Sequence, residues 1–436
     1  MRQLTITAIL AALVAGSLSE ASAQMAAPSA RSFAFAGSYV ARARGYEASF
    51  WNPANLGLPD APSWSLGLAG ASAYLNNNSL SYGQISDLYG EFLDDATKSE
   101  LLADIRAGEP DRMLEASADV GAHIIGASIW RFAFGVSSVG AGNLNVNSDA
   151  VELLLFGNAG EDGSGKDFSL DGSEAQAWAF TGGFASYAHP ITIPGLDYFG
   201  MKFSVGATLK YGVAHTLARL FDRGTIMTAN PLAVDVEAEA ITSVDASAGQ
   251  FWSLDLGAAM EYDRDLVVGV VLSNALANVS WNEEEFELHL LTAQADFDST
   301  TSNDTTLAFS ELTAEQQDQI IELLGAADVA KELRLGGVYR VTPMFTASFD
   351  YVELMGGNLR SRWDRTFSAG GELRPVSFLP LRIGLATDFG HFSYTGGFGI
   401  YAGPVHTDFA IGRWGVAGGD GIVGAISVSI WPGNGY

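Results

Sequence analysis

Several stretches of the chain alternate apolar and polar side chains at every second position, and this periodicity limits the possible folds more than any other feature. From Val405 to Trp414, the residues Val405, Phe409 and Ile411 are apolar, and the alternate positions hold the small or polar residues His406, Asp408, Ala410 and Gly412. Successive side chains of a β-strand point to opposite faces, so such a stretch predicts a strand with one apolar face. The same phase recurs in stretches that begin at Phe203, Leu254, Leu333, Phe345, Phe367 and Leu381.

The apolar faces of these stretches are rich in Phe, Tyr and Leu, and each stretch runs for about nine to twelve residues. A soluble sandwich would have strands of about five or six residues and more Lys, Glu and Thr on its exposed faces. The pattern is typical instead of membrane-spanning strands with lipid outside and a polar interior. We therefore predict an all-β fold, a transmembrane antiparallel β-barrel of about 14 strands that closes so that no sheet edge meets lipid.

The polar faces of the predicted strands carry basic and acidic residues in equal number, and we predict that these line the lumen. Opposite charges can neutralise each other there, which matters because an unpaired buried charge is costly. The set is open to two interpretations, a packed network without a transport role or a charged permeation path. Its members are Lys202, Lys210, Asp255, Glu261, Arg334, Arg340, Asp350, Glu372, Arg374, Arg382, Asp388 and Asp408.

The first 23 residues have the features of a cleaved signal peptide. Arg2 precedes an apolar run from Leu4 to Leu18, and the small residues of 21–23 suit a cleavage site. We predict export, with a mature chain that starts at Gln24. The sequence has no Cys, so neither a disulfide nor a lipid anchor on cysteine can form. No later run reaches the roughly 18 apolar residues that a membrane-spanning helix needs.

The formal net charge of −27 argues against nucleic acid as a partner, because its phosphates would be repelled. Much of this charge lies in acidic segments such as 161–174 and 283–287, interpreted as solvated exterior loops or as segments that recruit divalent cations. The six His residues are scattered and belong to no recognisable nucleophile or metal motif. We therefore expect no enzyme activity, no metal site and no cofactor.

Two segments break the strand alternation and predict helices in long loops. Residues 87–117 include Leu101, Leu102 and Ile105 at helical spacing, and the segment from Thr313 to Leu324 starts with a capping box. Both helices are too short and too polar to span a membrane.

Glycines in the segment from Gly135 to Asn145 suggest a weak point in the wall. Gly140 and Gly142 would permit a bulge, and a bulge could open the barrel sideways. The curvature of an ordinary barrel explains these glycines equally well. A lateral opening at Gly140 and Gly142 is thus a hypothesis.

Residues 24–62 precede the first predicted strand and lack sustained alternation. Their most constrained part is "ARARGYEASFWNPANLG", where Pro53 cannot donate an amide hydrogen bond and restricts Asn52. Such a segment cannot extend the sheet and is suited to packing inside a lumen. We predict that residues 24–62 form a hatch and that residues 63–436 form the barrel.

The hatch segment resembles that of the FadL family of outer-membrane barrels, in which a small-residue stretch leads into an Asn-Pro-Ala motif. Here the motif is Trp51, Asn52, Pro53 and Ala54, and residues 379–412 are similar to the closing hairpins of that family. The resemblance implies a barrel in the outer membrane, in contact with its lipid, that takes up a hydrophobic small-molecule ligand passively. Related PorV-type barrels imply an alternative, a closed barrel that partners a secretion-system protein or serves surface attachment. A diffusion porin with an acidic mouth is a third reading.

Overall fold

A computed structural model describes residues 29–80, 93–107, 113–229, 232–295, 300–357, 359, 364–416 and 419–432. The predicted signal peptide and residues 24–28 of the predicted hatch lie outside these ranges.

Fourteen antiparallel strands of the described residues form a closed ring, because β1 pairs with both β2 and β19. The closed barrel predicted from the alternation is therefore confirmed. In ring order the strands are β1 (Trp64–Asn77), β2 (Met113–Ile129), β3 (Phe132–Asn147), β5 (Glu174–Ile191), β6 (Met201–Asp222), β9 (Gly249–Tyr262), β10 (Leu266–Trp281), β13 (Lys331–Thr342), β14 (Phe345–Met355), β15 (Arg365–Val376), β16 (Leu379–Thr387), β17 (Phe392–Ala402), β18 (Val405–Val416) and β19 (Gly419–Ile430).

The outer face of the ring carries exposed apolar side chains. On β16 the alternate residues Leu381, Ile383 and Leu385 are exposed, whereas Arg382 between them is buried. Leu335 and Ile411 are likewise exposed on β13 and β18. Large apolar side chains on the outside and polar ones inside are the arrangement of a barrel surrounded by hydrocarbon.

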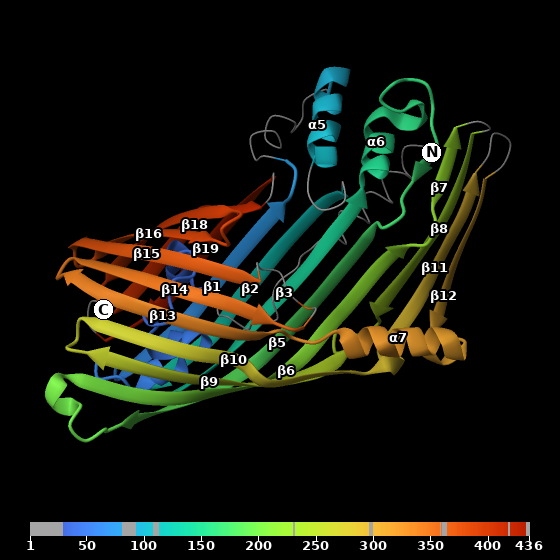
Figure 1. Ribbon diagram of the computed structural model, residues 1–436. Coiled ribbons are helices and arrows are strands. Elements are labelled where there is room, and N and C mark those ends of the chain that lie inside the picture. Colours follow the sequence, from blue (N-terminus) through green and yellow to red (C-terminus); the bar gives the residue numbers. More distant parts are fainter. Residues whose placement is uncertain are drawn as a thin grey trace.

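The two ends of the barrel differ. Connections of two or three residues join strands at one end, for example 130–131, 263–265 and 343–344, and this is called the turn end. The longest connections, such as those between β1 and β2 and between β10 and β13, lie at the other end, called the loop end. Figure 1 shows the turn end at the left, where the blue N-terminal segment is enclosed by strands.

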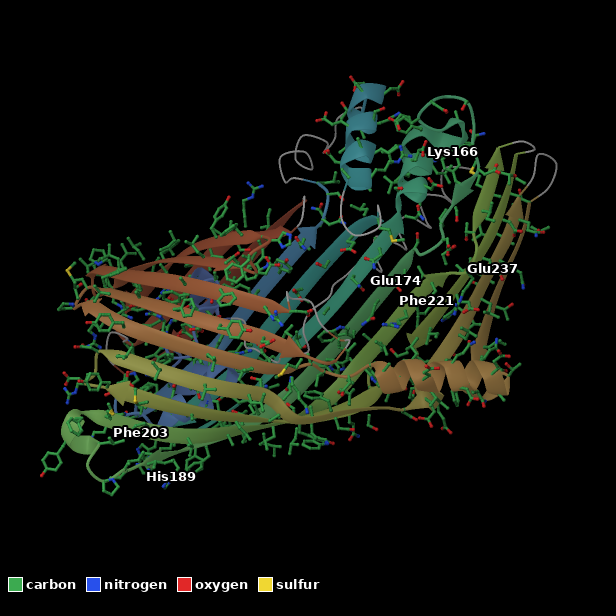
Figure 2. The ribbon with its side chains drawn as sticks, in the orientation of Figure 1. Lys166, Glu174, His189, Phe203, Phe221 and Glu237 are labelled. Atoms are coloured by element: carbon green, nitrogen blue, oxygen red, sulfur yellow. The ribbon has the colours of Figure 1, made fainter. Side chains whose placement is uncertain are left out.

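One side of the wall is much taller than the other. The first part of β6 pairs with β9, but Ala218–Asp222 pair with β8 (Leu232–Ser243), which also pairs with β11 (Phe286–Ala295). β12 (Thr300–Ala308) completes this extension on one side, and the short strands β7 (Ile226–Ala229) and β4 (Phe168–Ser169) add to it. In Figure 2, Phe203 and His189 lie near the turn end of this wall, whereas Phe221 and Glu237 lie on its extension.

The longer helices lie at the loop end. The two predicted loop helices are confirmed as α5 (Asp95–Ala107) and α7 (Ala314–Ala326), and Thr313 forms the predicted capping box with Gln316. A third helix, α6 (Ser148–Phe156), was not predicted; it begins after Asn147, whose side chain accepts a hydrogen bond from the Asp149 amide. Among the described residues, no helix is long and apolar enough to cross a membrane.

The exposed apolar side chains on the outer face of the ring predict that this face contacts lipid, and this can be tested. Ile383 lies at the centre of β16, and 62% of its surface is exposed. We expect Ile383→Arg to lower the free energy of unfolding in phospholipid vesicles by about 2–4 kcal/mol, because a guanidinium near the bilayer midplane loses hydration. Tyr198→Arg, in the exposed 3-10 turn Asp197–Phe199, should cost about 1 kcal/mol or less. Equal effects of the two substitutions would contradict a hydrocarbon-facing band.

Candidate functional site

The described N-terminal residues 29–62, called the hatch, fill the turn-end half of the lumen. The helix α2 (Ala30–Ala34) contacts β16 to β19, and the 3-10 helix η2 (Pro53–Gly57) contacts β5, β6 and β9 on the other side of the ring. Between them lie η1 (Gly45–Glu47) and α3 (Ala48–Trp51). Because the hatch reaches opposite walls, it closes this half of the barrel.

The Asn-Pro-Ala motif packs directly against glycines of the barrel wall. Asn52 accepts a hydrogen bond from the Ala54 amide at 3.1 Å and donates one to the carbonyl of Ala258 at 3.1 Å. Gly206 and Gly257 are register partners on β6 and β9. A Cβ atom on Gly206 would overlap the Pro53 backbone, and one on Gly257 would overlap the side chain of Asn52. The absence of side chains at these positions therefore lets the motif lie directly on the sheet.

Asp350 of β14 fixes the middle of the hatch. Its carboxylate accepts hydrogen bonds from the amides of Tyr39 and Val40, each at 2.7 Å, and both the carboxylate and its partners are buried. Asp350 is thus a wall residue whose partners are the backbone of the hatch.

An ionic network joins the hatch to β15, β16 and β18. Arg382 binds Glu372 through Nε at 2.7 Å and Asp408 through Nη1 at 2.6 Å. Arg31 of α2 binds the other oxygen of Asp408 at 2.7 Å, and Arg374 binds Glu372 at 2.8 Å. The charges of three strands and the hatch therefore satisfy one another away from bulk water.

Two further pairs involve predicted lumen charges. Lys210 and Asp255 are buried and form an ion pair at 2.6 Å between β6 and β9. Arg334 pairs with Glu332 at 2.8 Å and also donates to the carbonyl of Phe50 in the hatch at 3.0 Å. The guanidinium of Arg334 lies 4.7 Å from the centre of the Trp51 ring, so the first residue of the motif stacks on a wall charge.

The remaining predicted lumen charges lie at the ends of strands. Lys202 and Glu261 are register partners near the turn end, and Arg340 is exposed there. Asp388 lies after the end of β16 and contacts His391 in the same loop at 2.8 Å. Asp388 is apart from the network because the strand alternation stops at Thr387.

Part of the loop-end half of the lumen is apolar. Phe180 lies against Phe251 and Trp281, with ring centres 5.2 and 6.0 Å apart, and Trp178 and Phe286 belong to the same buried cluster. This group is called the aromatic cluster. The lumen thus contains an apolar region and a charged region, which the sequence pattern alone did not distinguish.

The helix α7 covers the aromatic cluster from the loop end. Ile320 and Leu324 of α7 are buried in the cluster, and Trp281 donates to the carbonyl of Ala327 at 3.2 Å. A pocket of about 230 Å³ remains between α7 and the extension of the wall, here called the outer pocket. Its lining residues are Phe221, Arg223, Glu239, Ile241, Leu288, Gln316, Gln319, Ile320 and Leu323.

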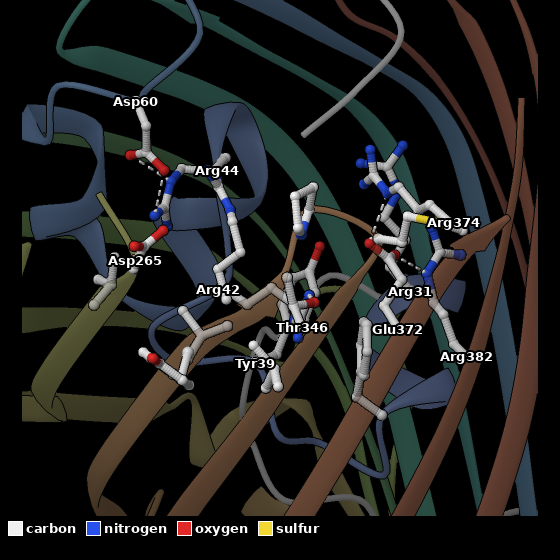
Figure 3. A pocket seen from close by; sticks show the side chains of 18 of the residues that line it. Arg31, Tyr39, Arg42, Arg44, Asp60, Asp265, Thr346, Glu372, Arg374 and Arg382 are labelled. Atoms are coloured by element: carbon white, nitrogen blue, oxygen red, sulfur yellow. Dashed lines mark hydrogen bonds and ion pairs between the residues drawn. The ribbon is translucent and has the colours of Figure 1, made fainter. Parts of the chain in front are cut away.

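A larger cavity, of about 610 Å³, lies at the turn end between the hatch and the wall. Residues of the hatch line one side, and residues next to the turns 263–265 and 343–344 line the other. Figure 3 shows Arg42 projecting into this turn-end cavity, with the pair of Arg44 and Asp60 on one side and Glu372 with its two arginines on the other. Arg44 binds Asp60 at 2.7 Å.

The glycines proposed as a lateral opening lie in a continuous part of the wall. Gly140 pairs with Val120 and Ala179 on its two neighbouring strands, and the ladders on both sides continue past Gly142. A register shift in β2 occurs instead between His123 and Ile125. Gly140 and Gly142 therefore lie in regular sheet.

Several functional residues were not predicted from the sequence. Arg31, Arg42, Arg44, Glu47 and Asp60 all belong to the hatch, whose prediction rested on its small residues and on the Asn-Pro-Ala motif. The basic and acidic residues predicted for the wall are equal in number, so all of them could pair with one another. Their number therefore gave no indication of partners in the hatch. The only available signal was that a segment predicted to be enclosed contains three arginines.

No protein-family model and no curated protein matches the sequence. Similar solved structures include the toluene transporter TbuX of Ralstonia pickettii, 14% identical, covering 93% of this chain and 99% of that chain, with a TM-score of 0.49. The toluene transporter TodX of Pseudomonas putida is 13% identical, covering 95% of this chain and 98% of that chain, with a TM-score of 0.48. A FadL homologue of Pseudomonas aeruginosa is 12% identical, covering 95% and 99%, with a TM-score of 0.47.

The contacts of Asp350 predict that this residue protects the hatch. In Asp350→Ala the amides of Tyr39 and Val40 lose a buried acceptor, and we expect their hydrogen exchange to accelerate by roughly tenfold or more. Asp350→Asn should have a smaller effect, because an amide oxygen still accepts hydrogen bonds. Asp304→Ala, on the exposed strand β12, should leave hatch exchange unchanged. Unaltered protection in Asp350→Ala would show that other contacts hold the hatch.

Proposed function

We propose that this protein is an outer-membrane barrel that lets hydrophobic small molecules pass inward without an energy source. The observation that carries the proposal is the aromatic cluster in the loop-end half of the lumen, which continues into the outer pocket, on the opposite side of a hatch that closes the turn end. The exposed apolar side chains of the wall supply the contact with lipid. Passage of this kind needs no cofactor and no catalytic step.

The outer pocket is suited to capture a hydrophobic molecule from the outside. Phe221, Ile241 and Leu288 provide apolar walls, and Arg223 and Glu239 lie at a polar edge. Apolar pockets with a few polar groups are the usual form of small-molecule sites. Since Ile241, Leu288 and Ile320 belong both to this pocket and to the aromatic cluster, a captured molecule moves from one to the other across a shared apolar surface.

The hatch favours gated passage over steady diffusion of ions. It reaches opposite walls and is held by buried hydrogen bonds and ion pairs, so no molecule crosses the turn end unless some of these contacts break. A diffusion porin needs a permanently water-filled path. For the scaffold alternative, no contact within the described residues supplies a specific argument.

Two neighbouring residues of α7 provide a matched test. Leu323 lines the outer pocket, whereas Ile321 is exposed away from it. We expect Leu323→Gln to reduce uptake of the neutral fluorophore N-phenyl-1-naphthylamine by intact cells roughly three- to tenfold, because apolar surface is lost from the capture site. Ile321→Gln should leave uptake unchanged. Equal surface levels of the variants, measured by antibody binding, make the rates comparable.

Three results would contradict the proposal. Cells with and without the protein could take up the fluorophore at the same rate. The protein could show a steady ion conductance in planar bilayers, which would indicate a porin. Gently extracted protein could carry a stoichiometric secretion-system protein and no hydrophobic ligand, which would favour the scaffold reading.

A further inference from the structure

The charge of the turn-end cavity is opposite to that of the whole chain. Seven arginines and four carboxylates line it, and the buried carboxylate of Asp408 pairs with two of these arginines, so the arginines exceed the carboxylates by two although the net charge of the protein is −27. Three of the arginines, Arg42, Arg264 and Arg340, form no ion pair within the described part of the chain. An arginine without an ion-pair partner keeps its positive charge, because its pKa is too high for the guanidinium to lose its proton.

Arg42 is the most constrained of these three. Its Nη1 donates to the hydroxyl of Thr346 at 2.9 Å, but Nε and Nη2 are buried and have no hydrogen-bond partner. The guanidinium is held over the ring of Phe35, 4.2 Å from the ring centre. Buried charged donors without an acceptor are costly, so the site favours a bound acceptor, and an anion would also match the charge.

Within the described ranges, no carboxylate forms an ion pair with Arg42. Glu372 is a candidate on the wall, but Arg374 and Arg382 already occupy both of its oxygens. Asp60 is likewise held by Arg44 through both oxygens. An acceptor for Nε and Nη2 of Arg42 therefore has to come from outside the described residues.

The other lining residues limit what kind of anion fits. Val267, Val338 and Met344 form an apolar side of the cavity. A volume of about 610 Å³ is within the range of small-molecule sites, roughly 300–1,000 Å³. A bare inorganic anion would leave both the volume and the apolar side unused.

We propose that the turn-end cavity binds a small organic monoanion, a carboxylate whose charged group binds the planar fork of Arg42 and whose apolar body lies against the side of Val267, Val338 and Met344. The guanidinium fork matches the two oxygens of a carboxylate. Arg340 and Arg264 add positive charge at the turn-end rim, which attracts the anion. This site does not depend on the proposed passage of neutral molecules, because it lies on the other side of the hatch from the aromatic cluster.

The test is calorimetric titration of the full chain in phospholipid nanodiscs. The probes are 3-phenylpropanoate, its neutral counterpart 3-phenylpropanamide, and inorganic phosphate. We expect the carboxylate to bind, the amide of the same shape to bind at least about tenfold more weakly, and phosphate to bind more weakly than the carboxylate.

Substitutions locate the binding. Arg42→Gln should weaken binding of 3-phenylpropanoate by about tenfold or more. Arg340→Gln, at an exposed position on β13 and outside the hatch, should weaken it by a smaller factor and covers the case in which Arg42→Gln disturbs folding. Arg365→Gln removes the same charge at the loop end, where Arg365 is exposed, and should have no effect.

Equal affinity for the carboxylate and the amide would overturn the proposal, and so would equal affinity for phosphate. Unchanged binding in both Arg42→Gln and Arg340→Gln would overturn it as well. Leu323→Gln separates this site from the proposed function, because it should reduce uptake at the loop end and leave binding of 3-phenylpropanoate unchanged.

Discussion

The pairing of β1 with β19 is the interaction on which the rest of the structure depends. It closes the ring, so each of the fourteen strands of the ring has two neighbours and no row of their backbone amides is left open to hydrocarbon. Closure of the ring also creates a lumen that is separated from the lipid. Polar side chains that alternate with the outward apolar ones are then forced into a confined space, where each charge needs a partner.

The hatch supplies partners for several of these confined charges. Arg31 supplies the second cation for Asp408, and the amides of Tyr39 and Val40 supply donors for Asp350. The hatch in turn could not lie so close to the wall without glycines such as Gly206 and Gly257. Wall and hatch therefore form one packed unit, and the contacts that hold the hatch are the ones that any passage has to break.

Strand periodicity was sufficient to predict the barrel, its approximate size and the outward face of residues such as Leu335 and Ile411. It could not separate the aromatic cluster from the charged half of the lumen, because Phe180 and Trp281 obey the same apolar signal as residues that face lipid. Which charges form ion pairs also depends on which strands lie near one another in the closed ring. Arg382 and Asp408 lie in different strands and Arg31 lies far away in sequence, so their contact depends on the closed ring and on the path of the hatch.

The unequal height of the wall sets where the outer pocket stands relative to the bilayer. β16 has 9 residues, which at about 3.4 Å per residue and a tilt near 40° correspond to roughly 23 Å, close to the thickness of the apolar band of such barrels. β6 has 22 residues, or about 57 Å by the same geometry. The end of β6, with Phe221, therefore projects roughly 30 Å beyond the hydrocarbon. A molecule that reaches the outer pocket arrives from the aqueous and headgroup layers, and it regains an apolar environment inside protein without first dissolving in the membrane.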